Sequence, residues 1–213
     1  MREKRTGSNI RKNKGLIFVI SGPSGSGKTT LAEALVKDKQ LAPRLVQSIS
    51  VTTRPKRPGE RQGEDYFFLS RQDFLRQRRG KKILEWTRYL GYYYGTPGEF
   101  VENQLAQGKS VVFCLDSRGV SQLRKIYPED IRTIFVIPPS LVELEQRIKR
   151  RSSQVTPGEI KRRLRLARHE LSLADKYDYR IANTQFAQAL SDLKKIFREE
   201  LGPVKSVLKG RYN

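Results

Sequence analysis

The chain has 213 residues, with 43 Lys or Arg against 22 Asp or Glu, so its formal net charge is +21. This length fits one domain with small inserted subdomains and is sufficient to bury a core. One Cys and one His exclude a disulfide scaffold and a Cys/His metal cluster and favour the cytoplasm, and no apolar stretch approaches the about 20 residues that span a membrane.

The first elements are a basic tail, a strand, a glycine-rich loop and a helix. Residues 1–14 are polar and basic, and we expect them to be disordered. Residues 16–20 form a short apolar run that predicts a buried parallel strand. Residues 28–37 follow the loop with apolar side chains at helical spacing, which predicts a helix.

Further apolar runs extend this pattern along the chain. Residues 110–115 and 131–137 predict two central strands, and residues 97–107 and 141–149 predict helices beside them. Residues 179–182 suit a last strand and residues 186–201 an amphipathic closing helix. Alternation of strands and helices indicates an α/β fold with a parallel sheet.

Two segments interrupt the alternation. Residues 46–96 contain short β-rich pieces at 48–53, 66–69 and 92–95, which predict a small inserted subdomain. Residues 147–173 are strongly basic and helical, with a break at 152–158 where Thr156 can cap a helix that begins at Pro157. This second segment predicts a mobile helical hairpin.

The loop after the first strand carries a specific motif. Gly22-Pro23-Ser24-Gly25-Ser26-Gly27-Lys28-Thr29 matches G-x-x-x-x-G-K-[ST] between a predicted strand and a predicted helix. Glycines let backbone N–H groups turn around a phosphate chain, and the helix start adds its positive dipole end. We expect Lys28 to contact the β and γ phosphates and the Thr29 hydroxyl to bind Mg²⁺. The loop alone does not distinguish ATPases, GTPases and small-molecule kinases.

A second set of motifs makes the chain resemble the guanylate kinase family from residue 16 to about residue 201. Residues 52–60 read T-T-R-P-K-R-P-G-E, similar to the family pattern T-T-R-x-x-R-x-G-E that binds GMP. Residues 63–68 (G-E-D-Y-F-F), 84–86 (L-E-W) and 91–96 (G-Y-Y-Y-G-T) resemble its next blocks. The resemblance implies transfer of the γ-phosphoryl group of ATP to GMP, with Mg²⁺ as the cofactor.

The residues of the acceptor site make chemical sense beside this resemblance. A dianionic monophosphate needs forked cations and hydroxyl donors, and a carboxylate facing the N–H edge of guanine discriminates against adenine. The resemblance implies a GMP site made of Ser50, Arg54, Arg57, Tyr66, Glu85, Tyr94, Thr96 and Asp116.

The resemblance also implies the donor site and the lid. The ATP site would comprise Gly22, Pro23, Ser24, Gly25, Ser26, Gly27, Lys28, Thr29, Thr30 and, against adenine, Asn183. Enzymes of this kind meet the charge of the moving phosphoryl group with arginines carried by a closing segment. The catalytic set would be Lys28, Arg54, Arg147, Arg151 and Arg163.

The chain departs from the family pattern at three positions. The family usually has D-I-D-x-Q-G where this chain reads Cys114-Leu115-Asp116-Ser117-Arg118-Gly119, so Cys114 replaces an acidic residue and Arg118 a glutamine. Thr184 replaces the acidic residue that commonly follows the adenine-contacting asparagine. A carboxylate at position 114 would help order metal-bound water, so we expect slower turnover.

These observations predict a P-loop nucleoside monophosphate kinase fold with a parallel five-stranded core sheet, an inserted mixed β subdomain and a helical lid. The expected divisions are a core at 15–46, 97–146 and 174–213, a GMP-binding subdomain at 47–96 and a lid at 147–173. The alternatives are a weakened guanylate kinase-like binding module and a basic P-loop protein associated with nucleic acid. The basic tail leaves an RNA or acidic partner open.

Overall fold

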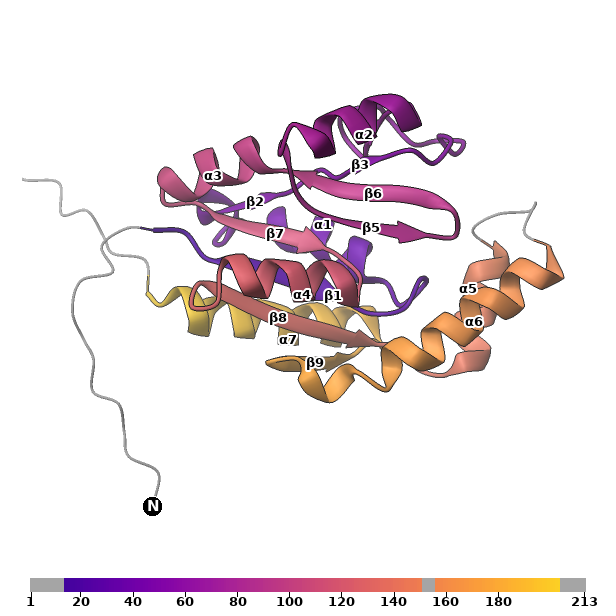
Figure 1. Ribbon diagram of the computed structural model, residues 1–213. Coiled ribbons are helices and arrows are strands. Elements are labelled where there is room, and N and C mark those ends of the chain that lie inside the picture. Colours follow the sequence, from indigo (N-terminus) through magenta and orange to yellow (C-terminus); the bar gives the residue numbers. More distant parts are fainter. Residues whose placement is uncertain (1–13, 151–155, 204–213) are drawn as a thin grey trace, which may run out of the picture. The chain divides into compact units, whose positions relative to one another are not determined.

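The computed structural model describes residues 14–150 and 156–203. The described chain divides into two compact units, and β1 (Ile17–Ser21), β7 (Ser110–Cys114) and β8 (Ile131–Ile137) each run from one unit into the other. One five-stranded sheet has the order β2-β7-β1-β8-β9, and a second sheet has four strands in the order β4-β3-β6-β5 (Figure 1). The predicted α/β fold with a parallel five-stranded sheet and an added mixed sheet is confirmed.

The first unit holds the four-stranded mixed sheet, which consists of β3 (Val51–Thr52), β4 (Phe67–Phe68), β5 (Ile83–Tyr89) and β6 (Tyr92–Pro97). The same unit contains β2 (Leu45–Gln47) of the five-stranded sheet and the helices α2 (Arg71–Arg79), α3 (Gly98–Ala106) and most of α4 (Ser117–Ile126). β5 and β6 form an antiparallel hairpin, with Glu85 opposite Thr96. Val51, Phe74 and Ile83 make the apolar cluster between this sheet and α2.

The second unit holds the loop motif and the closing elements. It contains α1 (Lys28–Val36), α5 (Leu141–Arg150), α6 (Pro157–Leu171), β9 (Tyr179–Ala182) and α7 (Phe186–Leu201), with short 3-10 turns at Ala42–Arg44 and Ala174–Lys176. The 3-10 turn Ala42–Arg44 reaches the first unit at its last residue. Helix α1 packs against α7, and α5 packs against α6.

Burial explains why these segments take these forms. All five residues of β1 are buried, as a strand between two others in a parallel sheet requires. The helical hairpin of α5 and α6 closes over Leu144, Ile148 and Ala167. The Thr156 side chain accepts a hydrogen bond from the Glu159 backbone N–H, which confirms the predicted cap of α6.

An ion pair holds the first described residue of the chain. Residues 1–13, most of the basic tail, lie outside the described residues, whereas the Lys14 ammonium lies 2.7 Å from an Asp130 carboxylate oxygen. Within residues 14–150 and 156–203, no helix is both long and apolar enough to pass through a lipid bilayer.

Candidate active site

The loop between β1 and α1 takes a shape that only glycine permits at two positions. Gly22 has φ 140° and Gly27 has φ 93°, in the region that L side chains rarely adopt. A Cβ at Gly27 would lie 2.3 Å from the Asn183 Nδ2 atom, and one at Gly22 would lie 2.5 Å from the Val136 carbonyl oxygen. Backbone geometry and close packing therefore both require glycine there.

The loop is fastened internally and to the end of β9. The Ser26 N–H donates to the Pro23 carbonyl at 3.0 Å, and the Lys28 ammonium donates to the same carbonyl at 3.3 Å. The Asn183 side-chain amide donates to the Ser26 carbonyl at 2.7 Å. The Ser26 hydroxyl is buried with no partner among the described residues. A ligand with a hydrogen-bond acceptor inside the loop would satisfy this hydroxyl.

A cavity of about 470 Å³ opens beside this loop. Its lining includes Arg147 of α5 and Asn183, both predicted site residues, together with loop and α1 residues. Phe186, whose side chain is 44% exposed, presents an apolar surface there. The full lining is Gly25, Gly27, Thr29, Thr30, Glu33, Arg147, Asn183, Thr184 and Phe186.

Two acidic or thiol groups near the loop have perturbed pKa values. Removal from water raises the pKa of the Cys114 thiol to about 12, and its sulfur donates to the Lys28 carbonyl at 3.8 Å. Removal from water also raises the pKa of Glu170 in α6 to about 7, with a smaller contribution in the same direction from Asp116 and an opposing one from Lys28. Asp116, like the loop, belongs to the second unit.

The three predicted lid arginines have different positions. Arg147 lines the loop cavity and its Nε donates to Glu143 at 3.0 Å. Arg163 is 8% exposed and its Nε donates to Glu159 at 2.9 Å, one turn earlier on α6. Arg151 lies outside the described residues.

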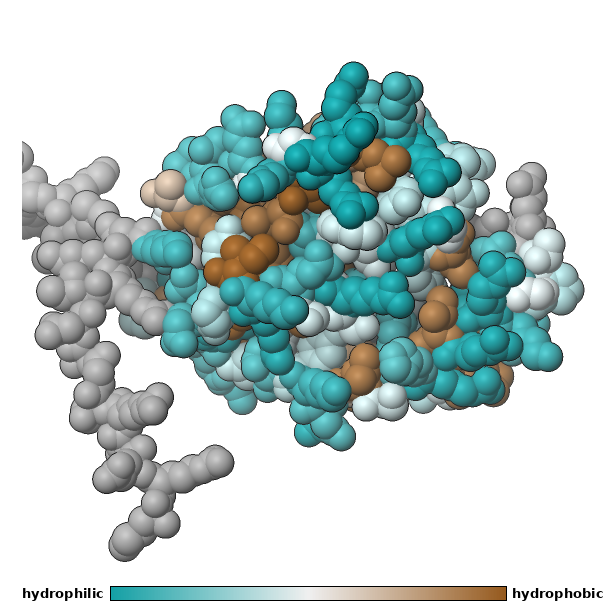
Figure 2. Space-filling view, in the orientation of Figure 1, coloured by the Kyte–Doolittle hydropathy of each residue, from teal (hydrophilic) through white to brown (hydrophobic). Residues whose placement is uncertain are grey.

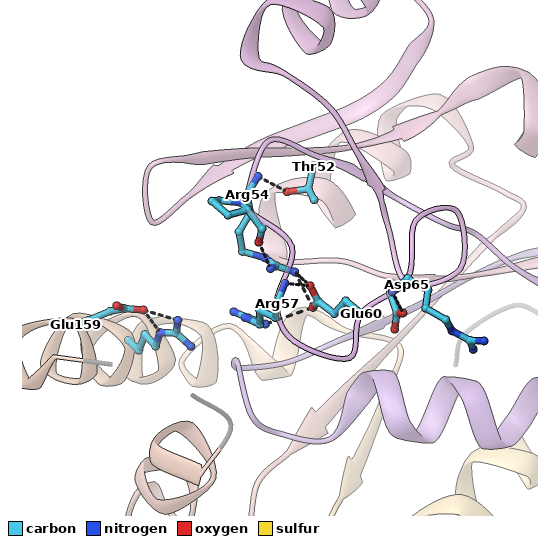
Figure 3. A network of polar contacts seen from close by, with 9 residues as sticks. Thr52, Arg54, Arg57, Glu60, Asp65 and Glu159 are labelled. Carbon is cyan, nitrogen blue, oxygen red and sulfur yellow. Dashed lines mark hydrogen bonds and ion pairs between the residues drawn. The ribbon is translucent and has the colours of Figure 1, made fainter. Parts of the chain in front are cut away.

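In the first unit, two predicted arginines meet at one carboxylate. Arg54 is 8% exposed, and its NH2 donates to both oxygens of Glu60 at 2.8 and 2.9 Å (Figure 3). The Arg57 backbone N–H donates to Glu60 at 2.9 Å, and the Arg57 guanidinium lies 3.8 Å from Glu60. The two guanidinium groups are thus held close together by a shared counterion, which the sequence did not assign.

Aromatic side chains surround this pair of arginines. The Arg54 guanidinium carbon lies 5.4 Å from the centre of the Tyr66 ring. Tyr66 and Tyr94 contact edge to face, with ring centroids 6.2 Å apart. The structure therefore brings Arg54, Arg57, Tyr66 and Tyr94 together in one cluster.

A buried carboxylate lies in the four-stranded sheet of the first unit. Glu85 of β5 is 2% exposed, and it accepts a hydrogen bond of 2.8 Å from the hydroxyl of Thr96, which is fully buried in β6. Gly95 leaves room for this pairing, because a Cβ there would lie 2.9 Å from the Glu85 carbonyl oxygen. Ser50 precedes β3, and its carbonyl oxygen accepts from the Phe67 N–H at 2.9 Å.

Comparisons with known proteins identify the family to which the chain belongs. Residues 14–200 match the guanylate kinase family model. The chain is 44% identical over 187 residues to a guanylate kinase from Hahella chejuensis, covering 88% of each chain, and 45% identical over 183 residues to one from Synechococcus, covering 86% of this chain and 82% of that one. The crystal structure of guanylate kinase from Anaplasma phagocytophilum superposes with a TM-score of 0.74 at 31% identity, covering 91% of this chain and 89% of that chain. The chain therefore belongs to the guanylate kinase family, a family of nucleoside monophosphate kinases.

Proposed function

We propose that the protein transfers the γ-phosphoryl group of ATP to GMP, giving ADP and GDP. The observation that carries the proposal is the buried Glu85–Thr96 pair in the four-stranded sheet that also carries Tyr94, with Arg54 just after the end of β3. A buried carboxylate is stabilised by hydrogen-bond donors, and its two oxygens can accept several hydrogen bonds at once. The ring N–H and exocyclic amine of guanine are donors of the required kind, and adenine lacks this pair.

The donor phosphates are bound by the loop in this proposal. The backbone N–H groups of residues 24–29, the dipole of α1 and the Lys28 ammonium supply the positive field. The buried Ser26 hydroxyl, which has no partner among the described residues, supplies a further donor. Thr30, at the exposed side of the cavity, and Asn183 complete the site, with adenine against the Phe186 ring.

The residues present also fit Mg²⁺. Mg²⁺ keeps several waters and needs few protein ligands when phosphate oxygens share the coordination, so the Thr29 hydroxyl beside the loop suffices as a protein ligand. Held there by the Thr29 hydroxyl, the ion would supply positive charge to offset the negative charge of the donor phosphates. Within the described residues no three His, Cys, Asp or Glu side chains form a group that would hold a metal alone.

The acceptor monophosphate is gripped by Arg54 and Arg57, with hydroxyl donation from Tyr66 and Tyr94. Before the substrate binds, the negative charge of Glu60 offsets the repulsion between the two guanidinium groups and holds them close together. Ser50 and Asp116 are assigned to the guanine end with Glu85 and Thr96.

The lid residues act on the moving phosphoryl group. Arg147 already lines the loop cavity, where it could contact a donor phosphate. Arg163 is hydrogen-bonded to Glu159 and would have to exchange this partner for phosphate when the lid closes. Arg151 is assigned by the same resemblance. The proposed lid spans residues 147–173 and the proposed GMP-binding subdomain residues 47–96.

No general base is required in this scheme. The attacking oxygen belongs to a phosphate that is already ionised, so acceleration comes from positioning and from charge stabilisation by Lys28 and the arginines. The reaction is assigned to the cytoplasm, because one Cys provides no internal disulfide for an oxidising compartment.

A coupled assay of ADP formation, with GMP, AMP, CMP and UMP offered in turn, tests the proposal. We expect turnover selective for GMP, dependent on Mg²⁺, and abolished by Lys28→Ala. Binding of GMP without ADP formation by the wild-type protein would instead identify a non-catalytic binding module. Equal turnover of AMP and GMP would contradict the role given to Glu85.

A further inference from the structure

A second charged surface lies on α2, within the first unit. Residues 71–82 contain four arginines and two lysines against one acidic residue, Asp73. Asp73 pairs with Arg76. The remaining cations are exposed, and we call them the basic α2 surface: Arg71, Arg78, Arg79, Lys81 and Lys82. Figure 2 shows the hydrophilic side chains that gather over this helix.

Four of these cations form no ion pair within the described chain. Helix α2 is held by its buried Phe74, packed with Val51 and Ile83, and by the Ser70 hydroxyl, which accepts from the Asp73 N–H. Arg71, Arg79, Lys81 and Lys82 have no acidic partner among residues 14–150 and 156–203. Like charges gathered without partners repel one another, so the arrangement favours an external polyanion.

Arg78 adds a feature that bare charge does not have. Its guanidinium carbon lies 4.0 Å from the centre of the Trp86 ring, and its side chain is exposed. At this distance the guanidinium group lies against the ring face, which restrains its orientation. The outer face of a restrained guanidinium plane is a surface on which a nucleic acid base can stack.

We propose that the basic α2 surface binds single-stranded nucleic acid, with Arg71, Arg79, Lys81 and Lys82 on phosphates and a base stacked on Arg78. A lipid surface fits less well, because a membrane-bound helix needs a free apolar face. The apolar Phe74 is fully buried against the sheet and Leu75 is half-buried. The proposal is independent of the kinase reaction, since none of these five residues belongs to the proposed nucleotide sites.

Fluorescence anisotropy with a labelled single-stranded RNA 20-mer tests the surface on the full chain. Four phosphate contacts predict that affinity falls about 50-fold between 50 and 200 mM salt. In the variant Arg71→Glu/Arg79→Glu/Lys82→Glu, one contact remains and the fall should be about threefold. The matched control is Lys39→Glu/Lys176→Glu/Lys195→Glu, which changes the net charge equally at exposed lysines of the second unit and should keep most of the wild-type salt dependence.

A second variant tests the stacking. Arg78→Lys keeps the charge and removes the planar group, so it should weaken RNA binding at least about fivefold and leave binding of base-free polyphosphate unchanged. Equal losses in the α2 variant and the lysine control would overturn the proposal, because net charge alone would then explain the binding. Tighter binding of vesicles that contain phosphatidylserine than of RNA would also overturn it.

The ADP-formation assay on the same variants separates this proposal from the kinase proposal. We expect GMP turnover to be unchanged in Arg71→Glu/Arg79→Glu/Lys82→Glu while RNA affinity falls. Loss of RNA binding with intact turnover supports the surface. Wild-type turnover together with RNA binding that the α2 variant retains would overturn it and leave the kinase assignment standing.

Discussion

The titration of Glu170 should change the stability of the protein between pH 4.5 and 7. It lies in the last turn of α6, and its Oε2 atom is buried with no hydrogen-bond partner among the described residues. Removal from water, and secondarily Asp116, raises its pKa from 4.5 to about 7, against the opposing charge of Lys28. Its position at the negative end of the helix dipole also disfavours ionisation.

The sign of the effect follows from linkage. The folded protein holds the Glu170 proton more tightly than the unfolded chain does, so the folded state is favoured at low pH and loses stability as pH rises from 4.5 to about 7. At about 1.4 kcal/mol for each pH unit, the full penalty is about 3 kcal/mol above pH 7. Solvent screening of the partly exposed side chain reduces it to about 2 kcal/mol.

Urea unfolding of Glu170→Gln and wild type at pH 5 and pH 8 measures this penalty. Gln imitates the protonated acid, and about a quarter of the penalty is already present at pH 5, so the stability gained by the variant should grow by about 1.5 kcal/mol between the two pH values. Glu199→Gln, at an exposed site on α7, is the control and should change stability by less than about 0.5 kcal/mol at either pH. A gain that is constant, or that grows toward pH 5, would refute the reasoning.

Four further outcomes are expected. Cys114→Asp should raise kcat at saturating Mg²⁺, and an unchanged rate at every Mg²⁺ concentration would contradict the role given to the missing carboxylate. The wild-type Cys114 thiol, with its pKa raised to about 12 by removal from water, should react with iodoacetamide at pH 8 at least about tenfold more slowly than in the urea-unfolded chain, and equal rates would be inconsistent with its environment. Gly27→Ala forces a Cβ to within 2.3 Å of Asn183 Nδ2 at φ 93° and should lower the unfolding free energy by about 2 kcal/mol or more, whereas Gly158→Ala, with nothing within 4 Å of the added Cβ, should be nearly neutral. Glu85→Gln should lower kcat/KM for GMP about 100-fold without lowering the affinity for ATP, and an equal loss with both nucleotides would point to misfolding.

Local signals in the sequence predicted most of the core. The predicted strands at 16–20, 110–115 and 131–137 agree with the observed strands to within a residue or two at each end. A parallel strand that is buried on both faces has a continuous apolar sequence, which makes it easy to recognise. Thr156 and Pro157 marked the start of α6 correctly. Strands β2 and β5 and helices α2 and α4 were not predicted. Helix α2 has Phe74 as its one fully buried residue among many charges, so its sequence lacks a clear apolar period.

The site was less accessible to sequence reasoning than the fold. Residue types and spacing indicated Arg54, Arg57 and the tyrosines, and the structure brings them together. The ion pairs that occupy these groups without substrate, Glu60 with Arg54 and Glu159 with Arg163, depend on side-chain conformations that spacing does not reveal. Phe186 and Glu33 at the loop cavity have no motif and were missed for that reason.

The hydrogen bond from Asn183 to Ser26 has a consequence for the order of events during synthesis. The two residues are 157 positions apart, so the loop lacks one of its hydrogen bonds until residue 183 has left the ribosome. Domains otherwise tend to fold from the N-terminus as they emerge. An unfinished chain that ends before β9 would lack the Asn183 amide that binds the Ser26 carbonyl, so its loop would be incompletely fixed.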